Sequence, residues 1–119
     1  MNYLEELKSL GADVDEGLDR VMGDEDLYTM MLGMFVGNVE ENAITAADFD
    51  GPDLEELIKK VHSLKGITGN LALTPLFTGY TEILGQLRAK QAAEGKAGYE
   101  KLLPVQSAIL DCIRSHQGA

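Results

Sequence analysis

Apolar side chains recur along the chain at intervals of three and four residues, which is the period of an amphipathic helix. Almost no stretch shows the alternation of apolar and polar residues that is typical of a β-strand. We therefore expect an all-helical protein. The expected helices cover about residues 2–10, the segment between Asp13 and Gly23, Asp24 to about Asp48, residues 53–71, Thr74 to a turn at residues 93–98, and residues 98–116.

Several residues are typical of helix ends. Asp13 is followed three residues later by Glu16, which is the spacing of a capping box. Thr74 and Pro75 are expected to be the N-cap and the first residue of the fifth helix. Pro104 lies inside the last helix, where its ring and missing N–H predict a kink.

Four long amphipathic helices joined by short loops predict an antiparallel up-down four-helix bundle. The two short helices before them are expected to form a lid, and residues 1–119 a single domain. The apolar stripes include Leu57, Val61, Leu64, Thr68, Phe77 and Leu103. The methionines Met30, Met31 and Met34 are also expected to fill the core, and any of them that is exposed would form an adaptable binding surface.

The chain is strongly acidic, with 20 acidic and 10 basic residues and a formal charge of −10. This charge argues against nucleic acid and anionic membranes as partners, since both are bound mainly by Lys and Arg. The charge is also uneven, because residues 1–56 hold 16 acidic and 2 basic residues, whereas residues 57–119 hold 4 acidic and 8 basic ones. A functional group in the second part therefore lies in a locally basic setting.

Cys112 is the one cysteine of the chain, so no internal disulfide can form. The first residues show neither the basic nor the apolar region of a signal peptide, and no apolar stretch is long enough to span a bilayer. We expect a cytoplasmic monomer that binds no metal. Cys112 is interpreted as a small core or boundary residue, and His116 as a residue of a frayed C-terminus.

The segment at residues 61–71 contains the most informative pattern. At about 100° per residue, one helix face carries the apolar stripe, and His62 falls at the margin of that face and should be exposed. The residues that share this margin are Glu55, Lys59, Gly66 and Gly69. Each glycine costs about 1 kcal/mol relative to alanine inside a helix, so two of them beside an exposed imidazole favour close approach of a partner. Lys65 adds a cation one turn after His62.

His62-Ser63-Leu64-Lys65-Gly66, followed by Asn70-Leu71, resembles the signature of the histidine-containing phosphotransfer (HPt) domain family. The resemblance extends to the N-terminal part, over residues 11–32. The chain departs from the family at Ile67-Thr68-Gly69, where small Ser and Ala residues are commoner, and at Ala72, where a glycine is frequent.

The resemblance implies that His62 is the phosphorylated histidine and that Lys65 is the cation beside the phosphoryl group. It implies that Gly66 gives clearance for a partner. Gly69, Lys59 and Glu55, which share the margin with His62, are further candidates for partner clearance or contact. Leu64 and Asn70 would be structural residues of the motif.

The implied function is that of a phosphorelay intermediate, which exchanges a phosphoryl group with the aspartate of response-regulator receiver domains or receives it from a sensor histidine kinase. A neutral imidazole can attack phosphorus at pH 7 without an activating base, and in-line transfer depends mainly on positioning and charge neutralisation. The chain would bind no cofactor, because the receiver domain would supply Mg²⁺ and no nucleotide-binding loop is present.

A helical adaptor that binds receiver domains without transferring phosphate is the alternative. A metal enzyme built on a helix bundle is not expected, because the chain has two histidines and no Glu-x-x-His pair.

Overall fold

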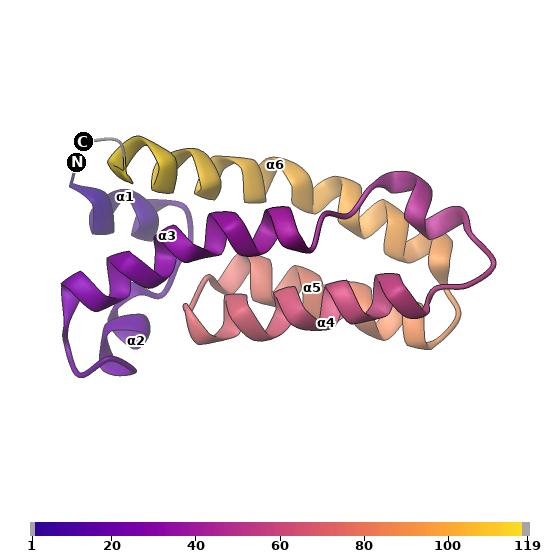
Figure 1. Cartoon of the computed structure of the whole chain (residues 1–119), viewed down its shortest axis with the longest axis horizontal. Helices are drawn as coiled ribbons and strands as arrows, with labels where there is room; N and C mark the ends of the chain where they lie inside the picture. The colour runs from indigo at the N-terminus through magenta and orange to yellow at the C-terminus, as the bar shows by residue number, and fades with distance from the viewer. Residues whose placement is uncertain (1, 118–119) are drawn as a thin grey trace.

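The computed structural model describes residues 2–117, and helices make up most of them (Figure 1). The helices are α1 (Tyr3–Ser9), α2 (Val14–Asp19), α3 (Glu25–Glu41), the 3-10 helix η1 (Ala46–Asp50), α4 (Glu55–Asn70), α5 (Thr74–Arg88) and α6 (Ala92–Gln117). No strand occurs in these residues, which confirms the expected all-helical class. None of the helices within residues 2–117 combines the length and apolarity that crossing a bilayer requires.

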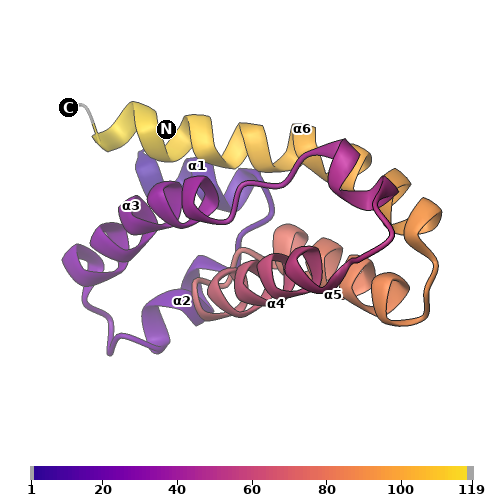
Figure 2. The same cartoon turned by 45° about the vertical axis from the view of Figure 1, so that its right-hand side comes forward.

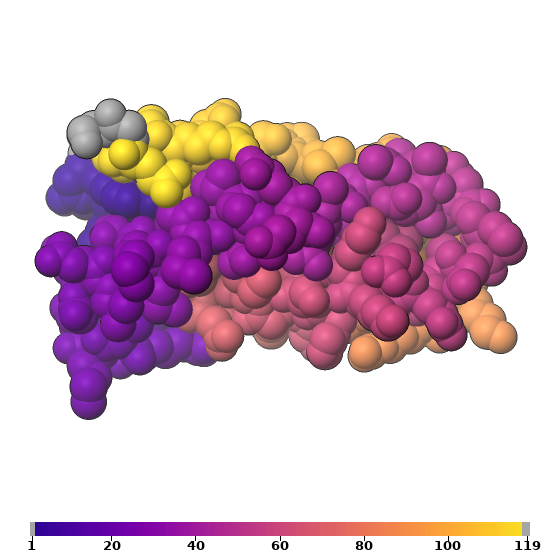
Figure 3. Space-filling model, in the orientation of Figure 1, coloured from indigo at the N-terminus to yellow at the C-terminus, as the bar shows by residue number. Residues whose placement is uncertain are grey.

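Helix α6 runs along the whole length of the molecule, and the other elements pack around it (Figures 1 and 2). Helices α4 and α5 lie side by side, and α5 also packs against α6. Helix α3 packs against the C-terminal half of α6, and η1 packs against its N-terminal half. Helix α1 covers the C-terminal end of α6, so the first helix and the last turns of the final helix lie at the same end of the molecule (Figure 3).

Helix α3 is shorter than the sequence predicts, because it ends at Glu41 instead of continuing to Asp48. Residues 42–45 are not helical, and backbone groups of Ile44 and Thr45 bond to side chains instead. The hydroxyl of Tyr99 donates a hydrogen bond of 2.9 Å to the carbonyl of Ile44. The backbone N–H of Thr45 donates one of 2.8 Å to the carboxylate of Asp48. These contacts start a new 3-10 turn where the apolar period suggested one helix.

Helix α6 is longer than predicted, because it begins at Ala92 and includes the segment 93–98 that was expected to be a turn. Gly95 is buried there, and a Cβ added to it would meet Leu87 at 3.5 Å and Phe49 at 3.6 Å. These are ordinary van der Waals distances, so a larger residue would also fit, and the packing of this segment against α5 and η1 outweighs the low helix propensity of glycine. The helix also continues without a break through Pro104.

In the first turns of three helices, a side-chain oxygen accepts a hydrogen bond from a backbone N–H group. Asp13 accepts a hydrogen bond from the backbone N–H of Glu16 at 3.2 Å, which confirms the predicted N-cap of α2. The N-cap of α5 was predicted wrongly: Thr74 is the first helical residue, and Leu73 precedes it without a side-chain cap. The other two caps are Asn2 at the start of α1 and Asp24 at the start of α3.

The core lies between α3, α4, α5 and α6. Its fully buried large side chains are Leu7, Tyr28, Leu32, Phe35, Leu64, Leu73, Leu76, Tyr80, Ile83, Leu84, Ile109 and Ile113. Four residues predicted for the core are exposed instead: Met30 by 56%, Met34 by 60%, Phe77 by 37% and Leu103 by 38%. They flank the buried stripes of their helices, where the helical period alone cannot tell buried from boundary positions.

The C-terminal end of α6 is not frayed within the described residues, contrary to expectation. Helix α6 continues to Gln117, and the ring of His116 stacks on that of Tyr3 with centroids 4.4 Å apart. The Nε2 atom of His116 also lies 2.9 Å from the carboxylate of Glu6. Contacts between α1 and α6 therefore hold this end of the chain in place. Cys112 is buried, as predicted.

Candidate functional site

His62 is exposed on α4, outside the stripe of residues by which this helix joins the core. The buried residues of α4 are Leu57, Val61, Leu64 and Thr68, at the spacing that the sequence predicts. The hydroxyl of Thr68 donates to the carbonyl of Leu64 at 2.8 Å, so this buried polar group is satisfied within the helix. Because the core contacts fix the rotation of α4, they hold His62 toward solvent.

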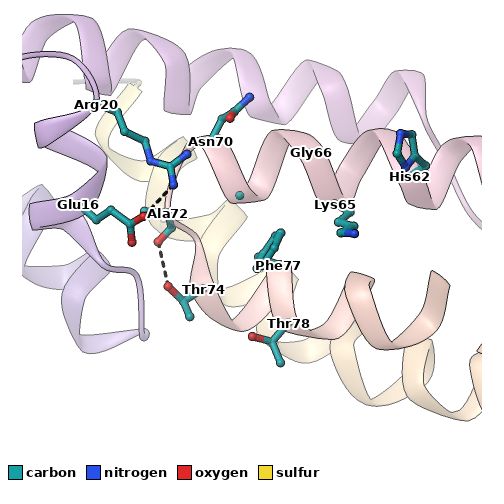
Figure 4. Close-up of a pocket in the computed structure, with 11 residues that line it drawn as sticks. Glu16, Arg20, His62, Lys65, Gly66, Asn70, Ala72, Thr74, Phe77 and Thr78 are labelled. Atoms are coloured by element: carbon teal, nitrogen blue, oxygen red, sulfur yellow. Dashed lines mark hydrogen bonds and ion pairs between the residues drawn. The ribbon is translucent and has the colours of Figure 1, made fainter. Parts of the chain in front are cut away.

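An open groove with a volume of about 570 Å³ runs along α4 and α5, and α2 closes one end of it (Figure 4). His62 lies toward one end of the groove and Arg20 toward the other. The lining residues are Glu16 and Arg20 near α2, His62, Lys65, Gly66, Gly69 and Asn70 on α4, and Ala72, Thr74, Phe77 and Thr78 at the start of α5. The groove therefore brings together five of the residues that the sequence singled out.

Lys65 follows His62 by one turn and is half-buried at the groove. Neither Lys65 nor His62 takes part in an ion pair within residues 2–117. The Lys65 ammonium is therefore free to neutralise a negative charge that approaches the imidazole. At about 4 Å, two unit charges near a protein surface attract each other by up to about 4 kcal/mol.

The two glycines of the motif have different surroundings. A Cβ added to Gly69 would lie 2.9 Å from the ring of Phe77, so Gly69 makes room for the contact between α4 and α5. A Cβ added to Gly66 would meet nothing within 4 Å, and Gly66 is exposed in the groove. Gly37 and Gly85 are equally open, so openness alone does not mark a site. Gly66 is distinguished from them by its position one turn after His62.

The end of α4 has the hydrogen bonds of a Schellman motif. The backbone N–H of Leu73 donates to the carbonyl of Thr68 at 3.0 Å, and that of Ala72 donates to Gly69 at 3.2 Å. Ala72 has a φ of 55°, in the left-handed region that glycine adopts most easily. Its carbonyl accepts a hydrogen bond of 2.8 Å from the N–H of Asp13, which holds the start of α2 against the end of the groove.

Arg20 and Glu16 complete the groove at its α2 end, joined by an ion pair of 2.7 Å. Neither residue was expected in the site. Their i, i+4 spacing predicts that they pair with each other. The same spacing contains no information on the distance between α2 and α4, which depends on the tertiary packing. Phe77, which was assigned to the core, is likewise a groove residue.

Three of the proposed motif residues do not line the groove. Glu55 and Lys59 are exposed nearer the start of α4, and Leu64 is buried in the core. Asn70 does line the groove, where its side chain is exposed. The structural role that the resemblance implies for Asn70 is therefore not supported by a buried position, whereas that of Leu64 fits its burial.

The groove offers an imidazole, an ammonium and a guanidinium group along one open surface. Such a surface suits an anionic group presented by a larger partner, because it is too open to enclose a small molecule. The only negative side chain among its lining residues, Glu16, is already paired with Arg20. No family model, curated protein or solved structure matches the chain.

Proposed function

We propose that this chain is a histidine phosphotransfer domain that acts as an intermediate in a two-component phosphorelay. His62 accepts a phosphoryl group from the aspartate of a receiver domain or from a sensor histidine kinase, and passes it on to a receiver. The observation that carries the proposal is the exposed imidazole of His62 in an open groove beside the unpaired ammonium of Lys65. In this proposal α3 to α6 form an antiparallel four-helix bundle with α1 and α2 as its lid, in a cytoplasmic monomer.

The transfer step is an in-line displacement at phosphorus. A ring nitrogen of His62 attacks the phosphoryl group of an aspartyl phosphate, the P–N bond forms, and the aspartate leaves as a carboxylate. The reverse reaction transfers the group to the next receiver. Little bond chemistry falls to the protein here, so catalysis depends on position and on charge neutralisation. Mg²⁺ held by the receiver supplies part of that neutralising charge.

The groove residues support this step in separate ways. Lys65 offsets the charge of the phosphoryl group on His62, and its cation has no competing partner within residues 2–117. Gly66 leaves the surface beside the imidazole free of side-chain atoms, so a receiver can approach closely. Arg20 and Phe77 extend the surface that a receiver would contact.

A transfer assay tests the proposal. The full chain is incubated with phosphorylated receiver domains and, separately, with phosphoramidate as a small phosphoryl donor, and acid-labile phosphate on the chain is measured. We expect uptake by the wild type and by His116→Gln, and none by His62→Gln with an unchanged circular dichroism spectrum. Uptake by His62→Gln would contradict the proposal. Receiver binding without any phosphate uptake would assign the chain to the alternative class, a non-transferring adaptor.

A further inference from the structure

Three side chains that can bind metals meet at the end of the molecule where α1 covers α6. Cys112 and His116 are separated by four residues on α6, so they project from the same helix face, and Glu6 reaches them from α1. One ligand atom from each lies within 4.8 Å of the other two. The Nε2 atom of His116 is 2.9 Å from a carboxylate oxygen of Glu6.

We propose that Glu6, Cys112 and His116 bind one Zn²⁺ ion, which ties α1 to the last turns of α6. Sulfur, imidazole nitrogen and carboxylate oxygen are the ligand atoms that Zn²⁺ takes in proteins. With bonds of about 2.0–2.3 Å in a tetrahedron, the ligand atoms stand about 3.3–3.7 Å apart. The separation of 2.9 Å between Glu6 and His116 is shorter than this range and none of the three exceeds 4.8 Å, so small rotations of the side chains would suffice to bind the ion.

Three protein ligands leave the fourth position of a tetrahedral site open for water. Beside the cluster, the hydroxyl oxygen of Tyr3 is buried and has no hydrogen-bond partner among the described residues. The ring of Tyr3 is held parallel to that of His116, at an interplanar angle of 3°. A buried hydroxyl without a partner costs free energy, and a water in the fourth position would provide one.

Zn²⁺ binds cysteine as the thiolate, so the proton of the Cys112 thiol passes to solvent as the Zn–S bond forms. Cys112 is deep in the core whereas Glu6 and His116 are half-buried, so the ion enters from the side of these two residues.

Metal titration of the full chain tests the site independently of phosphotransfer. The protein is freed of metal with a chelator and titrated with Zn²⁺ by calorimetry, and with Co²⁺ by absorption. We expect about one ion per chain and a thiolate-to-cobalt charge-transfer band in the near ultraviolet. Cys112→Ser should abolish the band, and Glu6→Gln should weaken Zn²⁺ binding by at least about 10-fold.

Two matched controls make the result specific. Glu5→Gln removes the adjacent acid, which is exposed and outside the cluster, and should bind Zn²⁺ as the wild type does. His62→Gln should also leave Zn²⁺ binding unchanged, so that failure of this site and failure of the phosphotransfer proposal are separate results. Absence of stoichiometric Zn²⁺ binding would overturn the site. Binding that survives both Cys112→Ser and Glu6→Gln, or that is lost in His62→Gln, would overturn it as well.

Discussion

The hydroxyl of Tyr28 on α3 donates a buried hydrogen bond of 2.8 Å to the backbone carbonyl of Leu71, at the end of α4. This contact joins two residues that are 43 positions apart in sequence, and it anchors the helix that carries His62. Gly17 of α2 packs against the same tyrosine, since a Cβ added there would lie 2.6 Å from the ring. One phenol therefore links α2 and α3 to the end of the groove.

Tyr28→Phe should lower the free energy of unfolding by about 1–3 kcal/mol, because the carbonyl of Leu71 is left buried without its partner. Urea denaturation followed by circular dichroism measures this change. Tyr3→Phe is the matched control in metal-free protein, since the Tyr3 hydroxyl has no partner to lose. Its stability should be unchanged or higher. Equal losses in both variants would contradict the role assigned to the Tyr28 hydrogen bond.

Stability should fall at high pH because of the buried tyrosines. Burial, and to a lesser degree the charge of Asp13, raises the pKa of Tyr28 from 10.0 to about 12. The unfolded chain therefore loses this proton first, so the contribution of Tyr28 to stability is complete below about pH 10 and disappears toward pH 12. Urea denaturation at a series of pH values should show this decline. A smaller decline is expected for Tyr28→Phe, and the same decline in both proteins would be the contrary result.

Gly66→Ala should raise the stability of the protein and lower its rate of phosphoryl transfer. The added methyl group meets nothing in the free protein, so the free energy of unfolding should rise by about 0.5–1 kcal/mol through better helix propensity. Transfer from a phosphorylated receiver should slow by at least about 10-fold, equivalent to about 1.4 kcal/mol of barrier, because the methyl group occupies the surface beside His62.

Gly37→Ala is the control for Gly66→Ala, since Gly37 is equally open but lies on α3 and outside the groove lining. It should show the gain in stability with wild-type transfer kinetics. If Gly66→Ala also showed wild-type transfer kinetics, Gly66 would not be needed to leave room for a receiver beside His62.

Lys65→Ala should slow phosphoryl transfer to His62 by about 10-fold, since the remaining groups supply less of the neutralising charge. Rapid-quench measurements with a phosphorylated receiver give this rate. Lys101→Ala removes an exposed lysine of α6 outside the groove lining and should leave the rate near that of the wild type. A rate for Lys65→Ala equal to that of Lys101→Ala would show that Lys65 has no special role.

The helical class and the exposure of His62 could be predicted because both follow from the apolar period of single helices. The rotation of α4 is fixed by Leu57, Val61 and Leu64, so their spacing leaves His62 outside the buried stripe. The ends of helices were harder to predict. Residues 42–45 leave the helix because of a contact between Tyr99 and Ile44, which are 55 residues apart in sequence.

The membership of the groove was only partly predictable. His62, Lys65 and Gly66 share one short motif, whereas Arg20 and Phe77 reach the groove from α2 and α5 through tertiary packing. The cluster of Glu6, Cys112 and His116 was also only partly predictable. His116 follows Cys112 at a spacing of four, which places both on one helix face. The third member, Glu6, comes from α1 at the other end of the chain.

Phosphorus NMR of the phosphorylated chain tests the central claim most directly, because it identifies the modified side chain. After incubation with phosphoramidate or a phosphorylated receiver, the wild type and His116→Gln should both show a phosphohistidine signal that disappears on acidification. His62→Gln, folded by circular dichroism, should show none. A phosphohistidine signal that persists in His62→Gln, or that is missing from the wild type with both donors, would contradict the assignment of His62 as the phosphoryl acceptor.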